Sequence, residues 1–427
     1  KISYAADWTE YFGHQVDGNV YFHLDPLWSD ENVDFVGIDN YMPISDWRDD
    51  EDHADAAFGD INNLDYLRSN IAGGEGFDWY YNSPEGEAAQ LRTPITDGAY
   101  DEPWIFRFKD LKSWWQNAHF NRIDGVRDPA GTGWVPQSKP FRFTEYGCAA
   151  IDKGANQPNK FLDPKSSESA LPRASTGRRD DLMQIAYLRA MREFWSDPAN
   201  NPLSAVTGEA MLDVSRSHVW TWDARPFPAF PNLDALWSDS DNYAHGHWLT
   251  GRSSSQPLAR VIAEICERAR IPAFDVTQAY GVVRGFSVNE IGSARSALQV
   301  LSLAYGIEVV ERHGVLVFRR RDARVARAVD PQTFAVSGEL DGIVETTRAA
   351  SAETLGRVRI SFVEAEGDFA VRTSEALFPD DTANVVSDTD LPLLLTGSEA
   401  RDMAERWLAE ARVARDRARF ALPPSAL

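Results

Sequence analysis

Residues 138–151, SKPFRFTEYGCAAI, contain the stretch that decides the fold prediction for the first part of the chain. The residues from Pro140 to Thr144 are mostly apolar, aromatic or β-branched, which suits a buried parallel strand. Glu145 falls where this strand ends, and the turn residue Gly147 follows two positions later. Burying a carboxylate is costly, and in (β/α)₈ barrels the carboxyl ends of the strands carry the active site. Glu145 is therefore a candidate catalytic residue.

Three further segments predict strands of the same kind. They are KISYAA (1–6), VDFVGID (33–39) and SHVWTW (217–222), and with FRFT (141–144) they alternate with long helical or irregular stretches, which is typical of βα units. Residues 178–195 carry apolar side chains at helical spacing and predict a helix before the last strand. The insert 42–137 is too long for an ordinary loop and predicts structure of its own.

Composition limits the classes of protein to which the chain can belong. Its 427 residues allow two or three domains, and 43% hydrophobic with 25% charged residues is ordinary for a globular protein. The formal charge of −22 argues against a surface that binds nucleic acid. No apolar run approaches the roughly 20 residues of a membrane span, and no secretory signal opens the chain. Both ends read as interrupted elements, so we expect a segment of a longer chain.

The cysteines and histidines give no sign of a metal site. Cys148 and Cys266 lie 118 residues apart without metal-ligand spacing, and the eight histidines form no HExxH or comparable pattern. We expect two buried free thiols, no metal and no organic cofactor.

The two halves of the chain differ in composition. Thirteen of the fourteen tryptophans precede residue 252, and the second half uses arginine but no lysine. The polar segment TGRSSSQPL (250–258) therefore marks the main boundary. We predict domains over residues 1–252, 253–330 and 331–427.

The second half predicts a helix over 257–271, a strand over 282–288, a helix over 291–306 and a hairpin over 307–321 around His313 and Gly314. A second hairpin is predicted over 356–377 and a long helix over 396–420, where Thr396 and Glu399 fit a capping box.

Polar and aromatic residues follow each predicted strand of the first half. Aromatic rings beside carboxylates suit a sugar, because pyranose faces are apolar and hydroxyls donate to carboxylates. The candidate binding residues are Asp7, Trp8, Asp39, Asn40, Tyr41, Tyr146, Trp222 and Asp223.

A structural interpretation stands beside each of these assignments. Asp39 fits a cap for the following loop, and Asp7 fits a bond to backbone amides at a strand end. Trp220 and Trp222 alternate on one predicted strand with the same facing, so one or both also fit the core.

Long stretches of the first half resemble the glycoside-hydrolase TIM-barrel-like domain of the large tail protein of gene transfer agents, which are phage-derived particles. These stretches are KISYAADWTEYFGH, VDFVGIDNYMPISDWRD, KPFRFTEYGCAAIDKGANQPNKF and VWTWDARPFPAFP. The second half resembles the phage tail hub module that follows this barrel. The resemblance implies an α/β part followed by an α+β part: the C-terminal half of a (β/α)₈ barrel, strands five to eight, and then an α+β and β-rich hub module.

The resemblance also implies functional roles. Glu145 corresponds to the strand-seven nucleophile of the related glycosidases, and the acid/base partner belongs to strand four, before Lys1. The hub module implies a trimeric homo-oligomer at the distal end of a virion tail, outside the cell after release. Its expected partners are tail tube, distal tail and tip proteins and cell-envelope glycan, with DNA passing through without specific binding.

Two functions follow from these observations. The first is a structural baseplate hub or tail-tip component that carries a glycosidase-like barrel able to contact surface glycan. The alternative is an active glycoside hydrolase that degrades cell-wall or capsule polysaccharide, with Glu145 attacking the anomeric carbon. A barrel that binds glycan without cleaving it is a third, weaker option.

Overall fold

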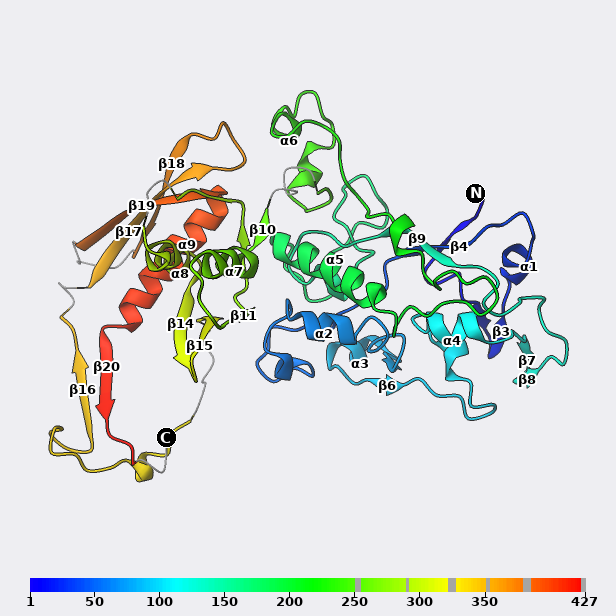
Figure 1. The fold of residues 1–427 in the computed structure, drawn as a ribbon, viewed down its shortest axis with the longest axis horizontal. Helices are drawn as coiled ribbons and strands as arrows, with labels where there is room; N and C mark the ends of the chain where they lie inside the picture. Colours follow the sequence, from blue (N-terminus) through cyan, green and yellow to red (C-terminus); the bar gives the residue numbers. More distant parts are fainter. Residues whose placement is uncertain (250–254, 289–291, 322–327, 351–353, 379–384, 424–427) are drawn as a thin grey trace. The chain divides into compact units, whose positions relative to one another are not determined.

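Two units make up the chain in a computed structural model that describes residues 1–249, 255–288, 292–321, 328–350, 354–378 and 385–423. The units are Lys1–Ser253 and Ser254–Leu427, and each has its own hydrophobic core. In Figure 1 the first unit runs from blue to green and the second from green to red. Residues 250–254 of the predicted boundary segment lie outside the described residues.

The centre of the first unit is a parallel sheet of three strands, β1 (Ala5–Asp7), β4 (Val36–Asn40) and β9 (Phe141–Tyr146), in that order. Residues 211–219 continue this order along β9, where Tyr146 N donates to His218 O at 3.0 Å and Val219 forms an isolated parallel bridge. The spatial order therefore follows the chain order, as in successive βα units. Within the described residues these strands form an open sheet and no closed barrel.

The strand predicted over 217–222 does not form as a regular strand, because the chain turns at Trp220 and Thr221 directly after the Val219 bridge. The helix predicted over 178–195 forms as α5 (Asp181–Ser196), and the Asp180 side chain caps it by accepting from Met183 N at 3.1 Å. Met183 and Tyr187 of α5 are fully buried in the core that includes Ile38 and Phe143 of the sheet.

The insert 42–137 carries structure, as its length predicted. It holds α2 (Leu64–Ser69), α3 (Pro84–Ala88), α4 (Leu111–Gln116) and the short strands β5 (Trp79–Tyr80), β6 (Thr93–Pro94), β7 (Arg122–Ile123) and β8 (Val126–Arg127). Outside the insert, β2 (His14–Val16) and β3 (Asn19–Tyr21) join β7 and β8 in an antiparallel sheet. The remaining helices of this unit are α1 (Asp25–Trp28) and α6 (Ala229–Asn232).

A buried histidine anchors the insert to the first residues of α1. His119 Nδ1 lies 2.8 Å from Asp25 Oδ2, and its Nε2 donates to Trp114 O at 2.8 Å. The imidazole stacks on Phe22 with ring centroids 4.3 Å apart. Both nitrogens are therefore satisfied inside an aromatic core, which removes the cost of burying them.

The second unit begins with β10 (Gln256–Pro257), α7 (Leu258–Arg268), β11 (Phe274–Gln278), β12 (Val282–Val283), β13 (Gly285–Phe286) and α8 (Ala294–Tyr305). The helices predicted over 257–271 and 291–306 are thus confirmed as α7 and α8. The predicted hairpin forms from β14 (Ile307–Arg312) and β15 (Val315–Arg320), whose turn residues His313 and Gly314 have φ of 52° and 80°. Such left-handed pairs match the twist of a two-residue hairpin loop. The sequence did not predict β11, which pairs parallel with β15.

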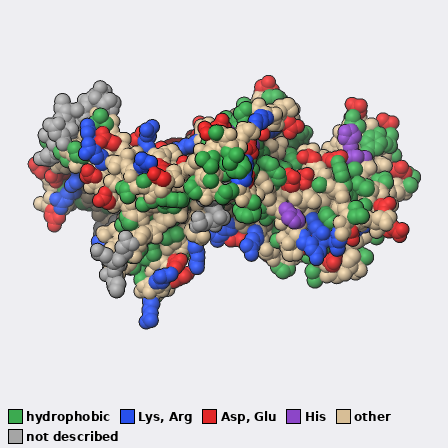
Figure 2. All heavy atoms as spheres, turned by 90° about the horizontal axis from the view of Figure 1, so that it is seen from above, with side chains coloured by type: hydrophobic (Ala, Val, Ile, Leu, Met, Phe, Trp, Pro, Cys, Tyr) green, Lys and Arg blue, Asp and Glu red, His purple; other side chains and the backbone are tan. Residues whose placement is uncertain are grey.

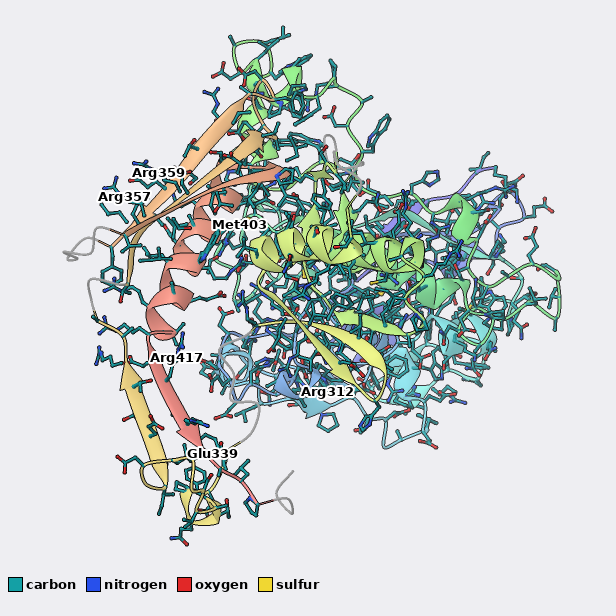
Figure 3. The ribbon with its side chains drawn as sticks, turned by 60° about the vertical axis from the view of Figure 1, so that its left-hand side comes forward. Arg312, Glu339, Arg357, Arg359, Met403 and Arg417 are labelled. Atoms are coloured by element: carbon teal, nitrogen blue, oxygen red, sulfur yellow. The ribbon has the colours of Figure 1, made fainter. Side chains whose placement is uncertain are left out.

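The second hairpin, β17 (Leu355–Glu364) and β18 (Val371–Leu377), is confirmed and belongs to a four-stranded sheet with the order β13-β19-β17-β18. Here β19 (Val385–Leu395) pairs parallel with β17, and α9 (Gly397–Val413) covers β17 and β18. Arg357 and Arg359 project from β17 on the side of the sheet away from Met403 of α9 (Figure 3).

The prediction of one helix over 396–420 was wrong at its end. The helix stops at Val413, and Asp416–Phe420 forms β20, which pairs antiparallel with β16 (Val344–Arg348). In residues 416–420 the pairing with β16 stabilises a strand, although their charge pattern is typical of a helix. The core of this unit includes residues from both sides of position 330, such as Leu301 and Val358. A separate domain over 331–427 stays a prediction.

Charge is distributed unequally between the two units. Acidic residues outnumber basic residues by 40 to 22 in residues 1–253 and by 25 to 21 in residues 254–427. On the face shown in Figure 2 acidic and basic side chains lie interspersed. The acidity of the chain therefore comes mainly from the first unit.

Candidate functional site

The carboxyl ends of the three parallel strands carry carboxylates at one level. In the strand register Asp7 of β1 lies opposite Asp39 of β4, and Asp39 lies opposite Glu145 of β9. The register shifts by one residue just before Asp39, which brings Glu145 rather than Thr144 to this level. The fold thus gathers three acidic residues that are far apart in the sequence along one sheet edge.

Glu145 is held by a tyrosine from the neighbouring strand. Tyr41, directly after β4, donates its hydroxyl to Glu145 Oε2 at 2.7 Å, and both side chains are half-buried. Burial, and then the hydrogen bond to Glu145, raise the pKa of Tyr41 far above its usual range. Tyr41 therefore stays protonated and acts as a fixed donor to the carboxylate.

The other residues at this level make local bonds. Thr144 Oγ1 donates to Asp39 Oδ1 at 2.7 Å. Asn40 is buried and its Oδ1 accepts from Met42 N at 3.1 Å, so Asn40 caps the loop after β4. Asp7 is exposed and its Oδ1 accepts from Thr9 N at 2.8 Å. Tyr146 is half-buried against the core, and burial raises its pKa.

Three predicted binding residues lie in different surroundings. Trp8 packs edge-on against Phe108 with ring centroids 4.8 Å apart. Trp222 is 63% exposed, whereas Asp223 accepts from Arg225 Nε at 2.9 Å. The hydrogen bonds from Arg225 lower the pKa of Asp223.

Arg225 makes a second ion pair, since its Nη1 lies 2.8 Å from Asp239 Oδ1. Its guanidinium also stacks over Phe230 at 3.7 Å. Asp223 therefore belongs to a cluster that ties together the turns after the Val219 bridge.

Phe161, an aromatic residue that the sequence did not single out, adjoins Tyr41. The ring of Phe161 lies 6.3 Å from Tyr41, 5.0 Å from Trp220 and 5.2 Å from His247. His247 is buried and its Nε2 donates to Leu162 O at 2.9 Å. Phe161 is the last residue of the stretch KPFRFTEYGCAAIDKGANQPNKF (139–161), which carries the family resemblance. No local sequence pattern indicates that Phe161 lies beside Tyr41.

The loops after β4 and β9 are fastened to each other. Trp47 N donates to Asn156 Oδ1 at 3.0 Å, and Asn156 Nδ2 donates back to Trp47 O at 2.9 Å. Arg173, whose side chain is 9% exposed, pairs with Asp46 at 3.2 Å and Glu75 at 2.8 Å. These bonds make the surroundings of the carboxylate edge a fixed scaffold.

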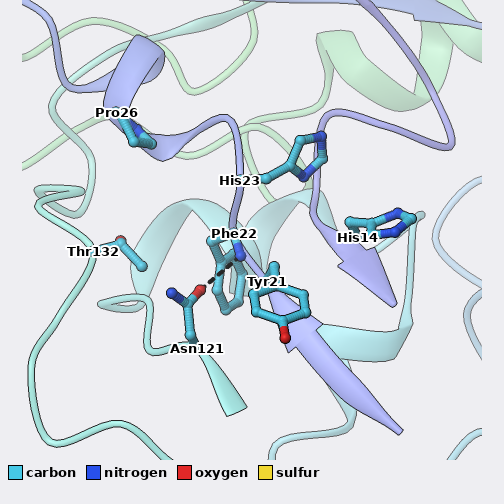
Figure 4. Close-up of a pocket in the computed structure, with 7 residues that line it drawn as sticks. All are labelled: His14, Tyr21, Phe22, His23, Pro26, Asn121 and Thr132. Carbon is cyan, nitrogen blue, oxygen red and sulfur yellow. Dashed lines mark hydrogen bonds between the residues drawn. The ribbon is translucent and has the colours of Figure 1, made fainter. Parts of the chain in front are cut away.

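A separate cavity of about 530 Å³ lies beside β2 and β3 (Figure 4). Among its lining residues, Asn121 Oδ1 accepts from Phe22 N at 2.9 Å. His14 and His23 line it with ring centroids 5.9 Å apart. In the described part of the chain, no group of three or more His, Cys, Asp or Glu residues could hold a metal ion. Among the described helices none is long and apolar enough to span a membrane.

Two family models match the chain, and together they define the class of protein to which it belongs. The model described as GTA TIM-barrel-like domain matches residues 1–231, and the model described as putative phage tail protein matches residues 293–427. The chain is a component of a gene transfer agent or phage-tail particle. It belongs to the family of the GTA TIM-barrel-like domain, whose model covers more than half of it. The resemblance noted from the sequence is thereby confirmed.

Solved structures give partial matches. A chain of the virion of a native gene transfer agent (GTA) particle is 50% identical, with 47% of each chain covered and a TM-score of 0.43. The 43 kDa tail protein of prophage MuSo2 from Shewanella oneidensis is 12% identical, with 39% of this chain and 51% of that chain covered and a TM-score of 0.26. The chain spans about half the length of these solved relatives. No curated protein matches it.

Proposed function

We propose that this chain is a structural hub at the distal end of the particle's tail, where it joins the tail tube to the tip. In this role it forms a homo-oligomer of three copies that contacts tail tube, distal tail and tip proteins. DNA passes through the assembly without specific binding. The site of action is the virion tail, outside the cell after release.

The observation that carries this proposal is the presence of both families in one chain. A GTA TIM-barrel-like domain over 1–231 and a phage tail domain over 293–427 together account for most of its length. The nearly balanced charge of the second unit also suits an assembly module, because a strongly single-signed surface would oppose packing of identical copies.

The first unit serves this hub as an attachment that contacts cell-envelope glycan. The row of Asp7, Asp39 and Glu145 offers acceptors for sugar hydroxyls, and Tyr41 fixes Glu145 in position. The exposed Trp222 offers an apolar face for a pyranose ring. Trp8, Asn40, Tyr146 and Asp223 complete the proposed binding set, with Asn40 and Asp223 acting through the loops they hold.

A second candidate function is glycoside hydrolysis, which the bond from Tyr41 to Glu145 favours. A carboxylate held by a fixed donor at a strand end is oriented for attack on an anomeric carbon. Hydrolysis needs a second carboxyl group at about 5–5.5 Å for retention or about 6.5–9.5 Å for inversion. The resemblance assigns that acid/base residue to strand four, before Lys1.

Glu145→Gln in the whole particle separates the two functions. The matched control is Glu10→Gln, because Glu10 also accepts from a tyrosine, Tyr4, at 3.2 Å but lies outside the carboxylate row. Three readouts are needed: particle assembly, gene transfer, and release of reducing ends from purified cell-wall and capsule polysaccharide.

The hub proposal expects normal assembly and gene transfer at no less than about half of the wild-type level in both variants, because only glycan contact is weakened. Hydrolysis instead expects that polysaccharide release is present in the wild type and Glu10→Gln and lost in Glu145→Gln. Normal tails from particles that lack residues 254–427 would refute the hub role.

A further inference from the structure

The cavity beside β2 and β3 shares no lining residue with the carboxylate row of the first unit. It measures about 530 Å³, within the range of roughly 300–1,000 Å³ that small-molecule sites occupy. The described side chains that line it carry aromatic, imidazole, amide, hydroxyl or proline groups, and none is a carboxylate, an ammonium or a guanidinium. The cavity wall is therefore uncharged, although the unit around it has 40 acidic and 22 basic residues.

A tight hairpin places two of the rings at this cavity. Asp17 and Gly18 have φ of 50° and 79°, the left-handed pair that suits a two-residue turn, and they join β2 to β3. The register then sets His14 of β2 opposite Tyr21 of β3. Side chains of such a cross-strand pair lie on the same face of the sheet. The rings of His14 and Tyr21 therefore line the cavity together.

A second imidazole follows β3. The ring centroids of His14 and His23 are 5.9 Å apart, and the interplanar angle is 72°. Both histidines are exposed, and neither ring has a hydrogen-bond partner within the described part of the chain. A neutral imidazole carries one donor and one acceptor nitrogen, so each ring offers both kinds of group to a ligand.

Asn121 supplies a donor with a fixed orientation. Its Oδ1 accepts from Phe22 N at 2.9 Å, which is the bond drawn in Figure 4. This bond orients the amide, because the Nδ2 group can only donate. Nδ2 itself has no partner among the described residues, and the side chain is half-buried. Two N–H groups of Asn121 therefore remain available to a ligand in the cavity.

A buried stack of rings holds the cavity wall in place. Phe22 is 3% exposed and stacks on His119 at 4.3 Å, and His119 stacks in turn on Trp134 at 5.5 Å. Thr132, another lining residue, donates its hydroxyl to Asp25, whose carboxylate also bonds His119. The cavity is thus preformed, and a ligand that enters it does not have to order these side chains.

The lining selects one class of ligand. An anion would find no cationic side chain in it, and a cation would find no carboxylate. A purely apolar ligand would leave the amide of Asn121 without an acceptor, which costs free energy. An uncharged sugar meets every requirement, because its hydroxyls both donate and accept and its apolar ring faces pack on aromatic rings.

We propose that this cavity binds an uncharged pyranose of a glycan, with the rings of His14, Tyr21 and His23 against the sugar and Asn121 Nδ2 donating to one of its oxygens. It is a second sugar site on the first unit, distinct from the carboxylate row. The inference rests on the proposed glycan contact of this unit. Two sites on one unit raise the avidity for a glycan that reaches both of them.

Titration calorimetry of the full chain with four trisaccharides tests the site. Cellotriose and tri-N-acetylchitotriose are uncharged, chitotriose with free amino groups is cationic, and trigalacturonate is anionic. The variants are the double substitution His14→Ala with His23→Ala, the row variant Glu145→Gln, and the control Tyr80→Ala, which removes a 45% exposed ring outside the cavity. Circular dichroism and urea unfolding verify that each variant is folded.

The cavity site predicts that the wild type binds at least one uncharged trisaccharide. The double histidine variant should weaken that binding by about tenfold or more, because two ring contacts are lost. Glu145→Gln and Tyr80→Ala should leave it within about twofold of the wild type, and the double variant should leave the binding of both charged trisaccharides within the same limit.

The failures of this site and of the proposed glycan contact are distinguishable. Uncharged binding that is lost in Glu145→Gln but kept in the double histidine variant places the sugar at the row, which overturns the cavity site and leaves the glycan contact standing. A wild type that binds only charged trisaccharides has the same meaning. Equal weakening of charged and uncharged binding in the double variant overturns the preference for an uncharged ligand. A wild type that binds none of the four counts against both proposals.

Chemical protection locates the bound sugar without any substitution. Diethyl pyrocarbonate acylates exposed imidazoles, and mass spectrometry of tryptic peptides reports the rate at each histidine. With the uncharged trisaccharide at about ten times its Kd, acylation of His14 and His23 should slow about tenfold, since only the free fraction reacts. His313, which is exposed in the second unit, should react at an unchanged rate. Equal protection of all three histidines, or of none, overturns the cavity site.

Discussion

Tyr41 and Glu145 are 104 residues apart in the sequence, yet the Tyr41 hydroxyl donates to Glu145 Oε2 at 2.7 Å. The parallel pairing of β4 with β9 brings them together, since Asn40 lies opposite Tyr146 in the register. A half-buried carboxylate with a fixed donor is oriented before any ligand arrives. This preorganisation is what the proposed glycan binding, or the alternative of glycan cleavage, requires.

Tyr41→Phe should lower the free energy of unfolding by about 1 kcal/mol, because one partly buried hydrogen bond is lost. It should also weaken the proposed glycan binding, since Glu145 is then free to change its orientation. Urea unfolding and binding to purified cell-wall glycan measure the two effects. Tyr4→Phe is the control, because the hydroxyl of the exposed Tyr4 donates to Glu10 at 3.2 Å, outside the carboxylate row. A change equal in both variants would contradict a special role for Tyr41.

His119→Ala should destabilise the first unit by about 3–5 kcal/mol, since it leaves the buried carboxylate of Asp25 without its imidazole partner. It also removes the ring that stacks on Phe22. Equilibrium urea unfolding followed by tryptophan fluorescence suits this region. His14→Ala, at an exposed histidine, should change stability by less than about 0.5 kcal/mol. Similar changes in the free energy of unfolding for the two variants would show that the contacts of His119 do not stabilise the first unit.

Stability should fall in acid through Asp97. Burial opposes ionisation of Asp97, but the hydrogen bonds from Arg122 and from the backbone N–H groups of Glu102 and Ala99 outweigh it and lower the pKa to about 2. The folded pKa is below the unfolded value of 3.8, so the stabilisation is complete above about pH 4 and is lost as the pH falls toward 2. The contribution is about 2 kcal/mol.

Asp97→Asn isolates this contribution from that of other acids. The stability difference between wild type and Asp97→Asn should be largest near pH 5 and should shrink by most of about 2 kcal/mol at pH 2. Urea unfolding at several pH values between 5 and 2 measures it. A difference that does not change with pH would refute the assignment.

The start of α9 should respond unequally to two alanine substitutions. Thr396 Oγ1 accepts from Glu399 N at 3.2 Å, and Glu399 Oε2 accepts from Thr396 N at 2.9 Å, so the predicted capping box is present. Thr396→Ala should cost about 1 kcal/mol. Glu399→Ala should cost about 2–3 kcal/mol, because Glu399 also binds Arg284 at 3.0 Å. Equal losses in thermal or urea unfolding would mean that the Arg284 bond contributes nothing.

Local patterns predicted the elements that local interactions hold. The capping box at Thr396, the left-handed turn at His313 and Gly314 and the apolar stripe of α5 each depend on residues close in sequence. The prediction was wrong where distant pairing dominates. Asp416–Phe420 reads as helix but pairs with β16, and the stretch 217–222 forms only the Val219 bridge.

The candidate site was predictable only in part for the same reason. Strand ends and their acidic residues follow from local hydrophobicity, so Asp39 and Glu145 could be singled out from the sequence. The residues that contact these side chains could not be predicted from the sequence. Asp223 accepts hydrogen bonds from Arg225, and Trp8 packs on Phe108. Phe161 contacts Tyr41, although the two residues are more than a hundred positions apart in the sequence.

The sequence by itself determined the elements that local interactions hold and the acidic character of the strand ends, because apolar spacing and turn chemistry act over a few residues. The tertiary structure alone decided the level at which Asp7, Asp39 and Glu145 meet, the donor that fixes Glu145, and the order of the strands in the sheet that ends with β18. These features depend on strand register and on contacts between residues that are far apart in the chain. Such contacts produce no periodic pattern in the sequence.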